Sequence, residues 1–212
     1  KPSRRLENRL RQKGFKLIAG LDEAGKGALA GPLVAGCVML PSDIKLQNLN
    51  DSKLLNPEQR QKLYLEIIKK ALQWSVGIID HEFIDKFGVQ EANRQAFKKA
   101  IKKLNLTPDY LLLDGLDIVH HPINYEYIVD GDAKVTSVAA ASIIAKVTRD
   151  HMMVRHDIEF PEFGFAQHKG YGTLEHQKII RKIGPSYFHR YSFHPIASKS
   201  RTGYKPVPGT FK

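Results

Sequence analysis

Short apolar runs alternate along this chain with longer stretches in which apolar residues recur every three or four positions. The runs are rich in leucine or β-branched residues and end at glycine, proline or polar residues, as strands of a buried sheet do. Four such runs predict strands at residues 17–22 (LIAGLD), 32–40 (PLVAGCVML), 74–80 (WSVGIID) and 109–114 (DYLLLD).

Helical spacing predicts helices between and after these strands. The first begins with Asn56 as an N-cap, Pro57 in the first turn and Gln59 at the capping-box position. A later stretch, residues 136–156, has an alanine and serine face that would allow close packing against the sheet. This alternation predicts an α/β fold with helices on the faces of the sheet. The predicted helices are residues 56–73, 90–104, 136–156 and, after a loop-rich segment, 174–184.

Composition adds limits to this picture. With 212 residues, 42% apolar and 9% aromatic, the chain has enough length and apolar content for one well-cored domain. No apolar run approaches the roughly 18 residues that span a bilayer, and the N-terminus has no apolar signal-peptide core. We therefore expect a cytoplasmic protein without a membrane partner. Cys37 is the only cysteine, which excludes an internal disulfide, and its apolar surroundings predict a buried, inert thiol.

Charge is unevenly distributed along the chain. There are 33 basic and 22 acidic residues, for a net charge of +11. Residues 1–16 carry +6 and residues 178–212 carry +8, which leaves residues 17–177 at −3. Basic ends around a mildly acidic centre fit a protein that grips a phosphate backbone with its periphery and keeps carboxylates at a central site. The alternative is a basic, disordered tail at each end.

Four acids lie at the ends of apolar runs or beside a glycine, where we expect strands to meet loops: Asp22, Glu23, Asp114 and Asp132. Sites in α/β sheets form outside the carboxyl ends of strands, so these acids can converge although they are distant in the sequence. Converging carboxylates repel one another unless they take up protons or bind a cation, and an all-oxygen cluster favours Mg²⁺ or Mn²⁺. Two metal ions about 4 Å apart can activate a water and stabilise the leaving oxygen of a phosphodiester. The alternative for any single acid is a structural role in a turn or cap.

These acids stand in longer stretches that resemble bacterial ribonuclease HII, the type 2 ribonuclease H family. The stretches follow the family's order over roughly residues 16–195: GLDEAGKGALAGPLVAG, DSKLL, LLLDG, GDAKVTSVAAASIIAKVTRD, FGFAQHKGYGT and HRYSFHP. The resemblance implies an RNase H-like fold, with a mixed central sheet flanked by helices and a helical C-terminal part. It also implies a metal-dependent endonuclease that hydrolyses the RNA strand of RNA/DNA hybrids and incises duplex DNA at embedded ribonucleotides, leaving 3′-hydroxyl and 5′-phosphate ends.

The same resemblance assigns roles to individual residues. The family's metal-binding quartet falls on the four acids named above. Gly25, Lys26 and Gly27 would approach the ribose beside the cleaved phosphate and sense its 2′-hydroxyl, and the family usually has arginine at the position of Lys26. Tyr171 matches a tyrosine that stacks near the RNA to DNA junction; the alternative is a packing role. Three lysines would contact phosphates, although such lysines are more commonly only solvated: Lys53, Lys146 and Lys169.

Other features narrow the interpretation. His168, His189 and His194 form no zinc motif, so we expect structural or phosphate-contacting roles for them. A second function class is a nucleic-acid-binding protein without catalysis, but such a protein has no need of four converging carboxylates. The related ribonuclease HIII usually carries an additional N-terminal domain, and only about 15 residues precede the first expected strand here. We expect a monomer with a basic N-terminal extension (1–15), a catalytic domain (16–203) and a flexible tail (204–212).

Overall fold

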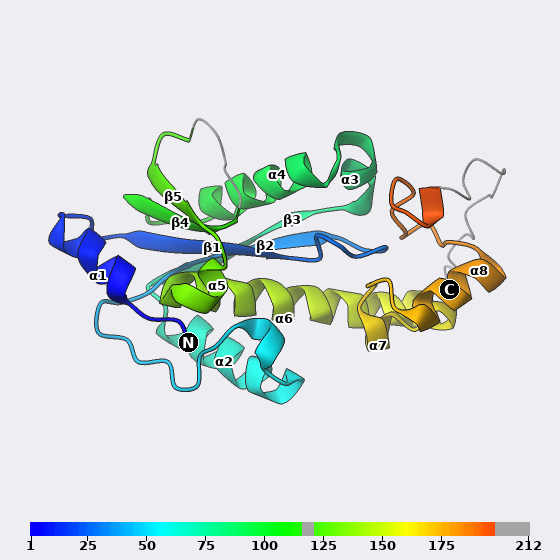
Figure 1. Cartoon of the computed structure of the whole chain (residues 1–212), viewed down its shortest axis with the longest axis horizontal. Coiled ribbons are helices and arrows are strands. Elements are labelled where there is room, and N and C mark those ends of the chain that lie inside the picture. The colour runs from blue at the N-terminus through cyan, green and yellow to red at the C-terminus, as the bar shows by residue number, and fades with distance from the viewer. Residues whose placement is uncertain (116–120, 198–212) are drawn as a thin grey trace.

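A five-stranded mixed sheet forms the centre of the protein, in a computed structural model that describes residues 1–115 and 121–197 (Figure 1). The spatial order of the strands is β3-β2-β1-β4-β5. β1 pairs antiparallel with β2, which pairs antiparallel with β3, whereas β1, β4 and β5 are parallel to their neighbours. The strands are β1 (Ile18–Ala24), β2 (Leu33–Met39), β3 (Gln73–Ile79), β4 (Tyr110–Asp114) and β5 (Asn124–Ile128).

Helices cover both faces of the sheet, which confirms the predicted α/β fold. Figure 1 shows α3 and α4 on one face and α2 and α6 on the other. A core cluster on the α4 side includes Phe97, and a second on the α6 side includes Leu63 and Ile67 of α2. The helices are α1 (Arg5–Gln12), α2 (Pro57–Lys70), α3 (His81–Phe87), α4 (Val89–Lys102), α5 (Gly131–Lys134), α6 (Thr136–Glu159), α7 (Phe165–His168) and α8 (Leu174–Ile183), with 3-10 turns η1 (Ser52–Leu54) and η2 (Pro161–Phe163).

The long helix α6 packs directly on β1 and β2, as its small-residue face predicts. A Cβ atom at Gly20 would lie 2.2 Å from the carbonyl carbon of Ser137, and one at Gly36 would lie 2.3 Å from the carbonyl oxygen of Ala141. These distances are shorter than any real Cβ contact, so only glycine fits at both positions. The close approach brings the middle of α6 next to the carboxyl end of β1.

The four predicted strands and four predicted helices are all present, and the capping box at Asn56 and Gln59 is formed. The buried thiol predicted at Cys37 is also confirmed, and burial raises its pKa. The helices and strands that the pattern did not predict are all short: α1, α3, α5, α7 and β5. β5 is an edge strand with no fully buried residue, so it lacks the apolar signature of the other strands.

The N-terminal segment packs on the domain, contrary to the disordered-tail alternative for this end. Leu10 of α1 is buried, and the Glu7 carboxylate accepts a hydrogen bond from the Ser137 backbone N–H at 2.9 Å. Glu7 thus caps the start of α6, whose own N-cap residue supplies no side-chain hydrogen bond. The predicted tail, residues 204–212, lies outside the described residues. No helix in the described ranges has the length and apolarity to cross a membrane.

Candidate active site

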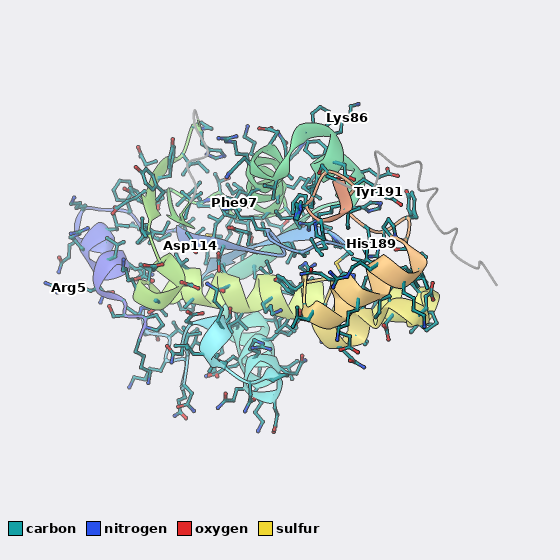
Figure 2. The ribbon with its side chains drawn as sticks, turned by 45° about the vertical axis from the view of Figure 1, so that its right-hand side comes forward. Arg5, Lys86, Phe97, Asp114, His189 and Tyr191 are labelled. Carbon is teal, nitrogen blue, oxygen red and sulfur yellow. The ribbon has the colours of Figure 1, made fainter. Side chains whose placement is uncertain are left out.

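Asp22 and Asp114 come together on adjacent parallel strands. Leu21 of β1 pairs with Leu113 of β4, so the next residue of each strand is an aspartate on the side of the sheet that faces α6. Asp114 ends β4, as predicted, and is labelled in Figure 2. Asp22 does not end its strand, because β1 continues to Ala24; the expected loop begins two residues later.

Asp132 reaches the same place from a different element. We expected Asp132 at the end of a strand, but it lies on the one-turn helix α5 that follows β5. The Gly131 backbone N–H donates to Asp114 Oδ1 at 2.6 Å, which holds α5 against the end of β4. One carboxylate oxygen from each of Asp22, Asp114 and Asp132 lies within 4.8 Å of the other two. Asp22 and Asp132 are only 5% and 3% exposed.

Glu23 lies beside this cluster rather than in it. Neighbouring residues of a strand point to opposite faces, so Glu23 and Asp22 leave β1 in different directions. Its Oε1 forms an ion pair with Lys26 Nζ at 3.3 Å. Its Oε2 is buried and has no hydrogen-bond partner among the described residues. An unpaired buried carboxylate oxygen is costly unless a cation or a donor completes it.

The electrostatics of the cluster fit a site for a cation. Burial raises the pKa of Asp22 well above its usual value, and the charges of Glu23 and Asp114 raise it further. Burial also raises the pKa of Asp114, and Asp132 and Glu23 add to this effect. Lys53 Nζ, 3.3 Å from Asp132 Oδ2, offsets part of the negative charge. Asp22 and Asp114 have raised pKa values, and one oxygen of Glu23 is unpaired. A cluster of carboxylate oxygens of this kind is suited to a divalent ion such as Mg²⁺ or Mn²⁺.

A cleft of about 440 Å³ opens above the carboxylates. Most of the predicted substrate-binding residues line this cleft, together with Ser52, Arg60 and Ser142. Lys169 lies in an adjoining cleft of about 480 Å³ that shares Arg60, Lys146 and Tyr171 with the first. The residues predicted to contact substrate that line the first cleft are Gly25, Lys26, Gly27, Lys53, Lys146 and Tyr171.

Comparison with known proteins decides the family. A family model described as Ribonuclease HII matches residues 19–196. The chain belongs to this family. It is 47% identical over 198 residues to ribonuclease HII of Dehalococcoides mccartyi, covering 92% of this chain and 93% of the relative. It is 50% identical over 182 residues to ribonuclease HII of Acetivibrio thermocellus, covering 86% and 71%.

The fold agrees with this family. The crystal structure of ribonuclease H2 from Pyrococcus horikoshii OT3 matches with a TM-score of 0.75 and 26% identity, covering 90% of this chain and all of that chain. The ribonuclease HII resemblance and the RNase H-like fold inferred from the sequence are therefore confirmed. The protein is a metal-dependent hydrolytic ribonuclease.

The two glycines that flank Lys26 in this ribonuclease have different surroundings. Gly25 has a φ of +92°, and a Cβ there would lie 2.0 Å from Arg149 Nε. Nothing lies within 4 Å of a Cβ built at Gly27, and its φ is not positive. The internal structure therefore explains Gly25, whereas it leaves the space beside Gly27 open to the cleft.

Two buried arginines support the cleft, and the sequence analysis assigned a role to neither. Arg149 donates from Nε to the Pro32 carbonyl at 2.9 Å and from Nη1 to the Lys169 carbonyl at 2.8 Å. Arg190 donates from Nη1 to the Lys26 carbonyl at 3.1 Å. Both arginines are 0% exposed and form no ion pair within the described ranges. They bind backbone carbonyls, and such contacts depend on the path of the chain rather than on side-chain identity.

Tyr171 is held by cations on its ring. Lys146 Nζ and the Arg149 guanidinium carbon each lie 5.0 Å from the ring centroid. Lys146 also pairs with Asp150 at 2.9 Å, and Lys169 Nζ donates to the Ala166 carbonyl. The cleft therefore brings aromatic and cationic groups together along one side of the carboxylates.

Proposed function

We propose that the protein is an endonuclease that hydrolyses the RNA strand of RNA/DNA hybrids and incises duplex DNA at embedded ribonucleotides. One observation carries the proposal: oxygens of Asp22, Asp114 and Asp132, from three different elements, converge within 4.8 Å, and two of these aspartates line a cleft with lysines on its walls. Carboxylates in such a place repel a phosphodiester unless divalent cations lie between them. The ribonuclease HII match supports the substrate class.

Asp22, Glu23, Asp114 and Asp132 would hold Mg²⁺ or Mn²⁺. Two bound ions would supply a water nucleophile of lowered pKa and stabilise the leaving oxygen, which gives 3′-hydroxyl and 5′-phosphate ends. The backbone N–H of Gly131 fixes Asp114, and the backbone N–H of Glu23 fixes Asp22 at 2.7 Å. The carboxylates are thus oriented before any ion or substrate arrives.

The cleft walls would select and position the substrate. The open space beside Gly27 supports close approach of a ribose, whose 2′-hydroxyl distinguishes RNA from DNA. Tyr171, which is half-buried and lines the cleft, would stack at the junction between RNA and DNA. Lys53, Lys146 and Lys169 would bind phosphates, which requires Lys53 and Lys146 to exchange their present ion pairs.

We further propose that the protein acts as a monomer in the cytoplasm. Its site is built from one chain, and no residue of a second copy is needed to complete the cluster of three aspartates. The competing function is nucleic-acid binding without catalysis, which the unpaired Glu23 oxygen and the raised pKa of Asp22 argue against.

Cleavage of three matched duplexes tests the proposal: a long RNA/DNA hybrid, a DNA duplex with one ribonucleotide, and an all-DNA duplex. We expect the first two to be cut with Mg²⁺ or Mn²⁺ and neither to be cut with a chelator. Binding of all three without any metal-dependent cleavage would favour the binding-only function. Cleavage of the all-DNA duplex at a similar rate would contradict the role of the 2′-hydroxyl.

A further inference from the structure

A buried chain of hydrogen bonds ends on the backbone of Tyr171. The Ser186 N–H donates to His189 Nδ1 at 2.9 Å, His189 Nε2 lies 2.9 Å from His176 Nε2, and His176 Nδ1 lies 2.9 Å from the Tyr171 carbonyl oxygen. Both imidazoles are 0% exposed, and neither lines the cleft. Figure 2 marks His189 beside α8, the helix that carries His176.

The two ends of this chain determine where every proton lies. A backbone N–H can only donate, so His189 Nδ1 must accept and its proton must be on Nε2. A backbone carbonyl can only accept, so His176 must carry its proton on Nδ1 and accept at Nε2. The pair therefore consists of two neutral rings in opposite tautomers, and no other arrangement makes all three hydrogen bonds.

The surroundings keep both rings neutral at physiological pH. Burial lowers the pKa of His176 to about 4, with a further contribution from His168, whose ring stacks on it at 4.0 Å. Burial lowers the pKa of His189 to about 3, with His176 contributing next. A proton added to His176 Nε2 would face the Nε2–H donor of His189. A proton added to His189 Nδ1 would oppose the Ser186 N–H and break that hydrogen bond, leaving only the Ser186 hydroxyl oxygen, 2.8 Å away, to accept it. His81 also acts on His189, whereas Glu175, Asp157 and Lys169 act on the stacked ring of His168.

The histidine pair joins two segments beside the cleft, the one that carries Tyr171 and the one that follows Gly27. Tyr171 bridges Ala28, and the Gly170 carbonyl accepts from the Leu29 N–H at 2.8 Å. On the other side, His189 bridges Ala30. The histidines thus hold the Tyr171 segment against residues 28–30, directly after the glycine pair that flanks Lys26.

We propose that His176 and His189 are positioning residues that set the place of Tyr171 in the cleft and so support selection of ribonucleotide substrates. This inference rests on the proposed function, because it assumes that Tyr171 stacks at the junction between RNA and DNA. The histidines touch no reacting atom. They act by fixing the carbonyl of Tyr171, and only the pair of opposite tautomers can do so.

The first test measures the tautomers directly and needs no substrate. Long-range ¹H–¹⁵N spectra at pH 7 should show His176 protonated on Nδ1 and His189 protonated on Nε2. Equal tautomers, or a protonated ring, would overturn the proposal. This readout is independent of activity, so it stands even if cleavage of ribonucleotide-containing DNA is never observed.

The second test compares three variants. His176→Phe keeps an aromatic ring but removes both hydrogen bonds, whereas His176→Asn keeps a donor near the position of Nδ1. His81→Phe is the matched control, because His81 is buried in the same region and its Nε2 has no partner among the described residues. For each, kcat and KM are measured on the single-ribonucleotide duplex and on the long hybrid.

We expect His176→Phe to lower kcat/KM on the single-ribonucleotide duplex by about tenfold, the effect of losing the buried hydrogen bond that holds the Tyr171 carbonyl. The long hybrid should lose less, with kcat unchanged. His176→Asn should recover part of the loss, and His81→Phe should behave as wild type. An equal loss on both substrates, or an equal loss in His81→Phe, would show a merely structural role. If His176→Phe does not fold, His189→Asn should shift the substrate ratio in the same direction, because asparagine keeps an acceptor for the Ser186 N–H but is too short to donate to His176 Nε2.

Discussion

Asp22 and Asp114 lie side by side on two parallel strands, one residue beyond the pair Leu21 and Leu113. They are 92 residues apart in the chain, yet the register of β1 and β4 leaves them on the same face and at the same end of the sheet. This relationship makes the charge cluster, because each aspartate raises the electrostatic cost of ionising the other.

Removing one of these charges should abolish hydrolysis. Asp22→Asn or Asp114→Asn should lower the cleavage rate by about a thousandfold or more, since a divalent ion supplies several kcal/mol to the transition state. Hybrid binding, measured by fluorescence anisotropy, should remain largely intact because the lysines are unchanged. Asp130→Asn is the matched control, since Asp130 has 73% of its side chain exposed and a left-handed backbone that asparagine accepts. Near-normal turnover in Asp22→Asn would refute the site.

Asp22→Asn should also stabilise the metal-free protein. Burial and neighbouring acids raise the pKa of Asp22, so its ionised form costs free energy at neutral pH. Asp22→Asn removes that cost, and each kcal/mol gained should raise Tm by about 2–4 °C in a chain of this size. Mg²⁺ should raise the Tm of the wild type more than that of the variant. A lower Tm for the variant in chelator would contradict the proposed repulsion.

The two glycines beside Lys26 should respond differently to alanine. Gly25→Ala should lower the free energy of unfolding by about 1–3 kcal/mol or more, because its φ is positive and a Cβ would overlap Arg149. Gly27→Ala should change stability by less than about 0.5 kcal/mol, since nothing surrounds that position. It should nevertheless slow cleavage at ribonucleotides by about ten- to a hundredfold, as a displaced ribose would. Thermal melts and cleavage assays separate the two effects, and an unimpaired Gly27→Ala would exclude close approach there.

Lys26→Arg should increase the preference for a single embedded ribonucleotide over a long hybrid severalfold. Lys26 is 41% exposed on its side chain and pairs with Glu23, while its carbonyl is already held by Arg190. The backbone is therefore in place, and the planar fork of arginine can bind a phosphate through two hydrogen bonds where lysine makes a point contact. The ratio of kcat/KM values on the two substrates is the measurement. An unchanged ratio would count against this role.

Acid should weaken the contribution of the histidine pair to stability. The pKa values of His176 and His189 fall to about 4 and about 3 in the folded protein, against about 6.5 in an unfolded chain. The unfolded chain therefore binds more protons, and stability present above about pH 6.5 is lost as the pH falls toward 4. The Tm difference between wild type and His176→Phe should shrink over this range. A difference that stays constant would mean that the rings are not held neutral.

Much of the fold could be predicted because its signals are local. The apolar runs identified β1 to β4, and Asn56 and Gln59 marked the start of α2. β5 was not predicted, because an edge strand buries few side chains and needs no alternation of apolar and polar residues. α1 was not predicted, because its packing depends on a contact between distant residues. Glu7, the single acid of a basic segment, accepts a hydrogen bond from Ser137, 130 residues further along the chain.

The sequence by itself determined which acids this protein carries, where its main strands and helices lie and which family it resembles. These follow from residue identity and from periodicities that each segment contains within itself. Only the tertiary structure decided that three aspartates and not Glu23 share one cluster, that Asp132 reaches it from a helix, and that two histidines connect Ser186 to Tyr171. Those facts depend on strand register and on contacts between distant segments, and no local pattern encodes the distance between two side chains that meet only when the chain folds.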